Sequence, residues 1–348
     1  MIQLDFRCLL REAGCFWNNL SNRASQRRQR CHLDERRYGM IGMPQAGRLP
    51  SISTLMTVSL LLAVALITDS SRAQSKGSSS GARRSVTLNV IIHAPSGKQV
   101  SKDDFDLYDA NVIQEVENFG KLDVGSRVVL MVDSSASLKI ESAALQKAVL
   151  GIVNELYSDD QMMVVGYNEK AEIIEDMTPD LTKLQATANK LIRKGVPSLF
   201  DALIAVADAF AHQAKTGVEK RAIILISDGY DSESKTKFEQ ALDELQDENV
   251  VLYAIQAPDR TRGSLVRGKP KPPSALAQLT GGTGGAIFPF DKASEAAKSV
   301  AEDLRNHWYR LVYTPSGVNT INTRRLLLMP RFKGLELRTK GSHPGRYH

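Results

Sequence analysis

Short apolar runs that alternate with helical patterns constrain the fold of this chain more than any other feature of its sequence. The clearest runs lie at 127–132 (RVVLMV), 162–167 (MMVVGY), 222–227 (AIILIS) and 250–255 (VVLYAI). A strand that lacks polar positions is buried on both faces, which is typical of a parallel sheet covered by helices on both sides. The sequence therefore predicts an α/β domain with a doubly wound, mostly parallel sheet over residues 124–306.

The segments between these runs show the apolar spacing of helices. We expect helices at 138–156, 181–192, 199–212, 237–248, 274–279 and 293–306, and further strands at 171–177 and 286–290. The glycine-rich stretch 281–285 precedes a strand, whereas a phosphate-binding loop leads into a helix. We therefore interpret this stretch as a turn.

Two segments that flank this region have the alternating pattern of strands. The first is 85–122, and the second is 307–348, with strand candidates at 308–313, 325–329 and 335–338. Because isolated pairs of strands are hardly stable in water, neither segment is expected to fold alone. We expect the two segments to pair into a smaller β module, with Trp308 and Tyr309 as core or interface residues.

The positive charge of the chain is concentrated at its start. Residues 1–50 contain nine Arg and four acidic residues, and the chain after Ala73 is nearly neutral although the net charge of the whole is +6. This distribution gives no reason to expect a nucleic acid as a partner. All three Cys precede residue 40, so the main body has no disulfide framework, thiolate metal site or cysteine nucleophile.

An apolar run near the start has the length of a secretory signal. The thirteen uncharged residues 55–67 are fewer than the roughly 20 that a membrane-spanning helix needs. Ser71 and Ala73 are small residues at the positions that a signal peptidase recognises. We therefore expect a leader over 1–73 and an exported protein, which is periplasmic, secreted or associated with the cell surface. An uncleaved membrane anchor is the alternative.

The first part of this leader is interpreted as a mis-assigned start. Residues 1–42 are long for the charged end of a signal peptide, whereas a start at Met43 gives a leader of ordinary length. After the leader, the Ser/Gly-rich residues 74–84 are expected to form a flexible linker.

Two of the buried runs end in an acidic residue. Asp133 opens the sequence Asp-Ser-Ser-Ala-Ser, and Asp228 directly follows the run at 222–227. Open α/β sheets bind ligands beyond the carboxyl ends of their strands, where these two carboxylates are expected to meet. Carboxylate and hydroxyl oxygens suit Mg²⁺, so Asp133, Ser135, Ser137 and Asp228 are candidate metal ligands, Asp228 through a water. In the alternative interpretation, Ser137 only caps the following helix.

This constellation resembles the metal-ion-dependent adhesion site of the von Willebrand factor type A domain, which has a Rossmann-like fold. Its Asp-x-Ser-x-Ser signature stands at 133–137, and its later Asp-Gly stands at 228–229. Family members usually place a Thr between them, but the corresponding residue here is Pro197, which has no hydroxyl. The resemblance implies that Ser198 or a water replaces this ligand, which makes Ser198 the fifth candidate.

The flanking segments narrow the resemblance. The motifs DDFDLYD at 103–109, GGTGGAIF at 281–288, YRLVYTP at 309–315 and LRTKG at 337–341 are similar to those of the von Willebrand factor type A-related proteins common in acidobacteria. The resemblance covers roughly residues 85–341.

The resemblance implies a non-enzymatic interaction or adhesion module. In such a site a Mg²⁺ or Mn²⁺ ion captures an Asp or Glu carboxylate of a partner protein, and no catalytic residue is expected. Two alternatives remain open. One is a metal-free scaffold whose site has decayed, as Pro197 suggests. The other is a Mg²⁺-dependent phosphatase-like hydrolase with Asp133 as nucleophile, which usually needs a second acid where this chain has Ser135.

The charged residues near these motifs are interpreted as solvated. The loop 260–271 contains five basic residues, with prolines at 270, 272 and 273, and Asp231 and Glu233 follow the strand-terminal Asp-Gly. Binding of an anion or a partner by the loop is the alternative.

Overall fold

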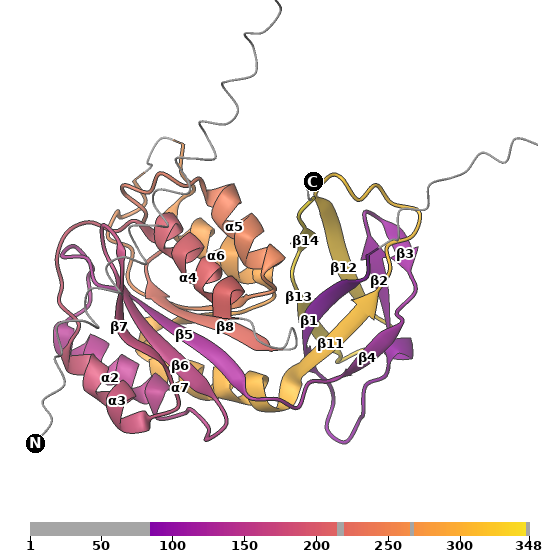
Figure 1. Cartoon of the computed structure of the whole chain (residues 1–348), viewed down its shortest axis with the longest axis horizontal. Helices are drawn as coiled ribbons and strands as arrows, with labels where there is room; N and C mark the ends of the chain where they lie inside the picture. Colours follow the sequence, from indigo (N-terminus) through magenta and orange to yellow (C-terminus); the bar gives the residue numbers. More distant parts are fainter. Residues whose placement is uncertain (1–83, 214–218, 265–267, 346–348) are drawn as a thin grey trace, which may run out of the picture. The chain divides into compact units, whose positions relative to one another are not determined.

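The computed structural model describes residues 84–213, 219–264 and 268–345 (Figure 1). The predicted leader over 1–73 lies outside these residues, as does the predicted linker up to residue 83. Within the described part of the chain, no helix is both long enough and apolar enough to cross a lipid bilayer.

A six-stranded sheet forms the centre of the larger part of the fold, as predicted. Its strands are β5 (Ser126–Asp133), β6 (Gln161–Tyr167), β7 (Ala171–Thr178), β8 (Lys220–Ser227), β9 (Val251–Gln256) and β10 (Ile287–Pro289). They lie in the order β10-β9-β8-β5-β6-β7, and β7 alone among these six is antiparallel to its neighbour. The chain runs from β5 to β6 on one side and later to β8 on the other, so the strand order reverses between β5 and β8. Such a reversal is the place where an open α/β sheet binds ligands.

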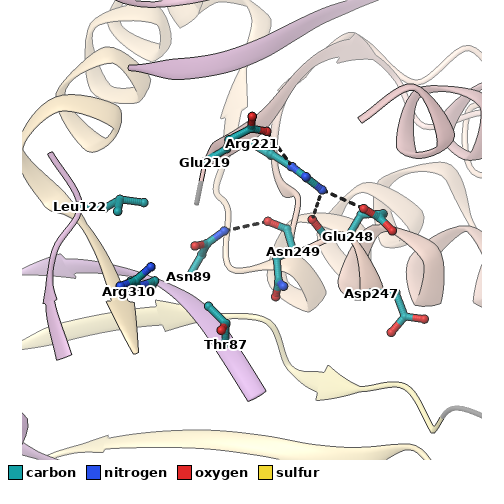
Figure 2. A pocket seen from close by; sticks show the side chains of 9 residues that line it. All are labelled: Thr87, Asn89, Leu122, Glu219, Arg221, Asp247, Glu248, Asn249 and Arg310. Atoms are coloured by element: carbon teal, nitrogen blue, oxygen red, sulfur yellow. Dashed lines mark hydrogen bonds and ion pairs between the residues drawn. The ribbon is translucent and has the colours of Figure 1, made fainter. Parts of the chain in front are cut away.

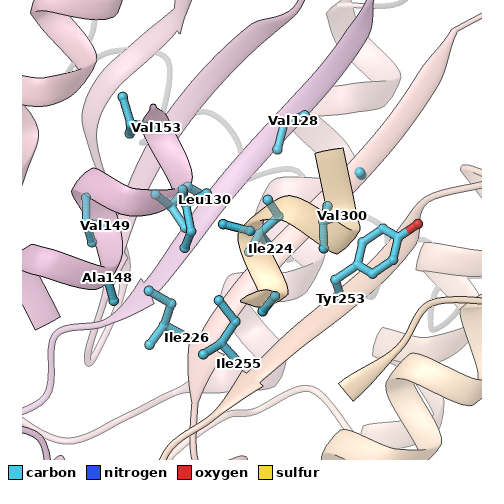
Figure 3. Packing of buried hydrophobic residues seen from close by; sticks show 14 of the residues in the cluster. Val128, Leu130, Ala148, Val149, Val153, Ile224, Ile226, Tyr253, Ile255 and Val300 are labelled. Carbon is cyan, nitrogen blue, oxygen red and sulfur yellow. The ribbon is translucent and has the colours of Figure 1, made fainter. Parts of the chain in front are cut away.

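Helices cover both faces of this sheet, and we call the sheet with its helices the sheet domain. They are α2 (Ser142–Val153), α3 (Leu181–Ala186), α4 (Leu199–Gln213), α5 (Phe238–Asp247), α6 (Pro272–Thr283) and α7 (Ala293–Glu302). Successive strand residues point to opposite faces. In β5, Val128 and Leu130 pack on the side of α2, α3 and α7 (Figure 3), whereas Val129 and Met131 pack on the side of α4, α5 and α6. Both faces of the strand are therefore apolar, as its sequence indicates.

Several predicted element boundaries are wrong. The helix expected at 181–192 ends at Ala186, and only a short 3₁₀ helix over Thr187–Asn189 follows it. The helix expected at 138–156 begins only at Ser142, since the preceding residues form a loop. The glycine-rich stretch is not a turn throughout, because α6 continues to Thr283 and Gly284 ends it with a left-handed φ of 83°. The next residue must be glycine for a different reason: a Cβ on Gly285 would lie 1.8 Å from the carbonyl oxygen of Leu252.

The flanking segments form two antiparallel sheets, which confirms that they pair with each other. The strands are β1 (Val86–His93), β2 (Phe105–Asp109), β3 (Val112–Gln114), β4 (Asn118–Lys121), β11 (Trp308–Tyr313), β12 (Arg324–Pro330), β13 (Glu336–Thr339) and β14 (Ser342–His343). One sheet has the order β13-β1-β11-β4 and the other β14-β12-β2-β3. Residues of both sheets, among them Leu88, Leu107, Leu311 and Leu326, share one buried apolar cluster. We call these two sheets the β module.

A buried ion pair lies within the β module. Asp109 is fully buried, and both of its carboxylate oxygens accept from Nε of Arg324 at 2.9 Å. The hydroxyl of Tyr313 donates to the same carboxylate at 2.8 Å, and burial raises the pKa of this tyrosine. The network therefore joins β2, β11 and β12.

A polar pocket lies where β1 meets the loop after α5 (Figure 2). Asn89 donates from Nδ2 to the carbonyl of Asn249 at 2.8 Å, and Nη1 of Arg221 lies 2.8 Å from a carboxylate oxygen of Glu248. Its lining contains none of the five predicted metal ligands. The pocket is therefore separate from the predicted site.

Candidate ligand site at the carboxyl end of the sheet

Two neighbouring parallel strands bring the predicted carboxylates together. Asp133 is the last residue of β5, and Asp228 directly follows the last residue of β8. The two strands pair in register up to Val132 and Ile226, so the acidic residues leave the sheet at the same edge. Both residues are completely buried. Two negative groups thus lie out of water at the point where the strand order reverses, and they require a positive partner there.

The loop after β5 is held in a fixed conformation. Ser135 donates to Oδ1 of Asp133 from its backbone N–H at 2.9 Å and from its hydroxyl at 2.5 Å. Arg193 donates to the carbonyl of Ile140 at 2.6 Å and to that of Leu138. Because these carbonyls bind a side chain, the segment does not begin a helix at residue 138. The loop instead places its serine hydroxyls beside Asp133.

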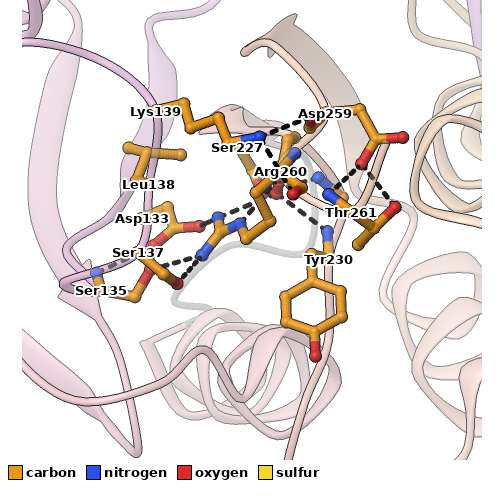
Figure 4. Close-up of polar contacts among 12 residues, drawn as sticks. Asp133, Ser135, Ser137, Leu138, Lys139, Ser227, Tyr230, Asp259, Arg260 and Thr261 are labelled. Carbon is orange, nitrogen blue, oxygen red and sulfur yellow. Dashed lines mark hydrogen bonds and ion pairs between the residues drawn. The ribbon is translucent and has the colours of Figure 1, made fainter. Parts of the chain in front are cut away.

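The guanidinium of Arg260 lies in the middle of this group of oxygens (Figure 4). Nε donates to Oδ2 of Asp228 at 2.7 Å, and Nη2 donates to Oδ1 of Asp228 at 2.8 Å and to Oδ2 of Asp133. Nη1 donates to the hydroxyls of Ser135 at 2.7 Å and Ser137 at 2.8 Å. An arginine has five N–H donors, and all five are used here. Only 5% of the side chain is exposed.

The backbone around Arg260 is fixed by its own hydrogen bonds. The carboxylate of Asp259 accepts from the backbone N–H groups of Thr261 at 2.8 Å and Gly263 at 3.0 Å, and from the Thr261 hydroxyl at 2.7 Å. Lys139 donates to the carbonyl of Arg260 at 3.0 Å, and the backbone N–H of Arg260 donates to Asp228 at 3.0 Å. The interpretation of this residue as part of a solvated loop is therefore wrong.

Asp231 is also not the solvated acid that the sequence suggested. Its side chain is 1% exposed and forms an ion pair with Lys269. It accepts from the backbone N–H of Phe200 at 3.3 Å and from the hydroxyl of Ser234. Asp231 thus ties the loop after β8 to the first turn of α4, while Glu233 is exposed as expected.

The fifth predicted ligand does not join the group around Arg260. Ser198 is buried directly before α4, where its N–H donates to the carbonyl of Asn168 at 2.7 Å and its carbonyl accepts from Ala202 at 3.1 Å. Pro197 holds the neighbouring loop through its carbonyl, which accepts from the N–H of Ser232 at 2.8 Å. The other four predicted ligands all contact the guanidinium, so Ser198 alone among the five predicted ligands does not belong to this group.

Burial and charge act in opposite directions on the ionisable groups of the site. Burial raises the pKa of Asp133 above its ordinary value of 3.8, although Arg260 and Ser135 oppose this rise. Burial lowers the pKa of Arg260, but the hydrogen bonds and charges of Asp228 and Asp133 outweigh it and raise that pKa above its ordinary range. The guanidinium is therefore charged, and one positive charge faces two carboxylates.

In this conformation the oxygens do not fit a metal ion, although their chemistry suits one. Mg²⁺ binds oxygen ligands at about 2.0–2.1 Å. The hydroxyls of Ser135 and Ser137 converge on Nη1 of Arg260, which lies 2.7 and 2.8 Å from them, so an ion shared by these oxygens would take the place of the guanidinium. Arg260 thus supplies the positive charge and occupies the oxygen lone pairs to which a metal ion would bind.

Gly229, next to Asp228, lies where the backbone conformation and the neighbouring atoms leave no room for a side chain. Its φ is 83°, and a Cβ would lie 2.2 Å from the carbonyl oxygen of Pro272 and 2.7 Å from Leu276. We expect Gly229→Ala to lower the free energy of unfolding, measured in urea, clearly more than Gly263→Ala does. Gly263 has the same φ with open space around it, so that variant incurs only the left-handed backbone cost of about 1–2 kcal/mol. Equal losses would contradict the close packing of α6 on the end of β8.

The fold and the site together define a class of protein. A doubly wound, mostly parallel sheet with helices on both faces is a Rossmann-like domain, and here it carries an Asp-x-Ser-x-Ser loop beside a strand-terminal Asp-Gly. The family model for the von Willebrand factor type A domain matches residues 128–303, about half of the chain. The chain belongs to this family, whose domains are typically non-enzymatic protein-interaction modules.

Several solved structures resemble the chain at low identity. A von Willebrand factor type A protein from Catenulispora acidiphila is 10% identical with a TM-score of 0.45, over 70% of this chain and 75% of that one. An aerotolerance-related membrane protein from Bacteroides fragilis, with multiple mutations to serine, is 16% identical with a TM-score of 0.40, over 52% of this chain and 98% of that one. BatB from Bacteroides thetaiotaomicron is 18% identical with a TM-score of 0.41, over 52% and 97%. No curated protein matches. Similarities at this level say nothing about partner or activity.

Proposed function

We propose that this chain is a non-enzymatic protein-interaction module that binds its partner at the carboxyl end of the central sheet. The observation that carries the proposal is the group of Asp133, Ser135, Ser137 and Asp228 around one guanidinium at the reversal of strand order. This is the ligand-binding position of open α/β sheets, and family membership supports an interaction role.

The state of Asp133 supports a role in binding rather than in hydrolysis. A carboxylate nucleophile must reach its substrate with a free oxygen. Here Oδ1 accepts from Ser135 and Oδ2 accepts from Arg260, and the residue is completely buried. Ser135, at the position of the second acid in the hydrolase alternative, cannot protonate a leaving group as a carboxylic acid does. The phosphatase-like alternative is therefore the weaker one.

In its more specific form, the proposal includes a Mg²⁺ or Mn²⁺ ion at this site and an Asp or Glu carboxylate of the partner that binds to the ion. Both require a conformation in which Arg260 has left the oxygens, because it contacts Asp133, Ser135 and Asp228. Export is likewise proposed, and it is supported by the apolar run and cleavage-site residues of the predicted leader.

A capture experiment tests the position of the binding surface. The full chain is immobilised and incubated with the exported protein fraction of its source, with and without a chelator. Ala136→Arg places a long charged side chain on the exposed loop beside the site, and Ala110→Arg makes the same change at an exposed alanine of the β module. We expect capture by the wild type and Ala110→Arg, and loss of the same partner with Ala136→Arg.

The possible outcomes separate the alternatives. Capture that survives Ala136→Arg would contradict the proposed binding surface. Capture that the chelator abolishes would favour the metal-bridged form, and capture that it leaves unchanged would favour the metal-free form.

A further inference from the structure

We propose that Arg260 is the cation of this site: the chain supplies from its own loop the charge that a divalent ion would supply, and the two exclude each other. The inference rests on the proposed function for the role of the site, although its test needs no partner. Its consequence is that the site is closed and metal-independent as long as Arg260 remains in place.

The first argument is how completely the guanidinium and the site match. Its five N–H groups donate to five oxygen atoms of four residues. The donor–acceptor distances are 2.7 Å for Nε and 2.7 and 2.8 Å for Nη1. A solvated arginine that lies near acidic residues by chance does not use its whole donor set inside a 5% exposed side chain. The contacts therefore define a built site for a guanidinium.

The second argument is the charge. Asp133 and Asp228 are both completely buried, and an uncompensated buried carboxylate is very unfavourable. Among the other described cations beside this loop, Lys139 and Arg193 donate to backbone carbonyls, and Lys194 pairs with Glu172. Compensation at the two acidic residues thus comes from Arg260. Without its side chain, two carboxylates and two hydroxyls would surround an empty space, which is a donor set for Mg²⁺ or Mn²⁺.

The third argument is the positioning of the arginine and the loss of a metal ligand elsewhere. The backbone of Arg260 is held at the strand end independently of its side chain. It is held by the turn that Asp259 forms with Thr261 and Gly263 and by the hydrogen bond from the backbone N–H of Arg260 to Asp228. Pro197 offers no hydroxyl at the place where the family usually has one. A metal ion would lack that ligand, whereas Arg260 has all its donors satisfied without it.

The inference limits how a partner can bind. Because no N–H of Arg260 is left over, a partner carboxylate cannot bind to the guanidinium in this conformation. The exposed rim around the site, at Ala136 and Ser137, is the part that a partner can contact.

Metal titration tests the proposal directly. The full chain is titrated calorimetrically with Mn²⁺ as wild type, as Arg260→Ala and as Arg262→Ala. Arg262 is exposed and lies two residues away in the same loop, so its variant removes one positive charge without opening the site. We expect Arg260→Ala to bind one Mn²⁺ at least about tenfold more tightly than the wild type, because a closed site weakens apparent affinity by its open fraction. Arg262→Ala should behave like the wild type, and adding Asp133→Ala should abolish the gain.

Two results would overturn the proposal. One is wild-type binding of Mn²⁺ as tight as that of Arg260→Ala, and the other is no binding by folded Arg260→Ala. Should this variant fold only with Mn²⁺ present, the proposal is supported. Thermal unfolding of the wild type gives an independent measurement: the midpoint should be the same in chelator and in Mn²⁺, and an increase that Asp133→Ala removes would contradict the proposal. Neither experiment depends on capture of a partner, so the proposed function can fail separately.

Discussion

Replacement of Arg260 by methionine is expected to lower the free energy of unfolding by about 3–5 kcal/mol, as removal of one partner of a buried ion pair does. Methionine retains much of the apolar stem, so the loss reports the missing guanidinium rather than a cavity. Asp133 and Asp228, both completely buried, are then left without a cation. Urea unfolding at neutral pH in a metal-free buffer measures the effect.

Two comparisons isolate the cause of this loss. Arg262→Met makes the same change at an exposed residue of the same loop and should leave the unfolding midpoint almost unchanged. In a background with Asp133→Asn and Asp228→Asn, Arg260→Met should cost much less, because no uncompensated charge remains. If Arg260→Met costs no more than Arg262→Met, the guanidinium does not stabilise the site.

The loss should also depend on pH. Burial raises the pKa of Asp133 and Arg260 opposes this, so removal of Arg260 raises that pKa further above 3.8. The folded variant then retains a proton that the unfolded chain releases above about pH 3.8. Its stability is therefore greatest at acid pH and falls as the pH rises through the raised pKa. A loss that is independent of pH would contradict this account.

Replacement of Asp109 by alanine in the β module is expected to have a similarly large effect, about 3–5 kcal/mol of unfolding free energy. The change leaves the guanidinium of Arg324 buried without its partner and removes the acceptor of the Tyr313 hydroxyl. Because these residues lie on three different strands, we expect the whole β module to be destabilised. Urea unfolding followed by circular dichroism measures the loss.

The same strand provides a matched control. Asp106 pairs with Arg331, whose side chain is 53% exposed, so Asp106→Ala removes an ion pair that water screens. It should leave the midpoint nearly unchanged. Comparable losses for the two variants would mean that burial does not determine the strength of the Asp109 pair.

The strands and the position of the site could be predicted from the sequence because both follow from short-range patterns. Runs without polar residues identify parallel strands, and an acidic residue directly after such a run must lie at the carboxyl edge. The same reasoning could have found Arg260, which follows the end of β9 by four residues and so lies at that edge as well. Its cluster of basic neighbours instead suggested a solvated loop.

The burial of Arg260 and Asp231 could not be predicted because it depends on distant partners. Arg260 contacts Asp133 across 127 positions of the chain, and Asp231 pairs with Lys269 across 38. A charged residue in a loop has the same local pattern whether it is solvated or paired. Ser198, which lies directly before α4, is the predicted ligand that does not join the group around Arg260, and its place beside the motif did not distinguish it from the other four.

Because the β module is built from the two flanking segments, the sheet domain is an insertion in the sequence between them. Leu122 and Trp308, where the chain enters and leaves the sheet domain, are joined by a backbone hydrogen bond of 2.9 Å, and β1 pairs with β11 along Val86 to Ile91. A pulling force applied to the two ends of the described chain is therefore first borne by the antiparallel ladders of the β module. The sheet domain, which is inserted between the two halves of the β module, experiences that tension only after those ladders separate.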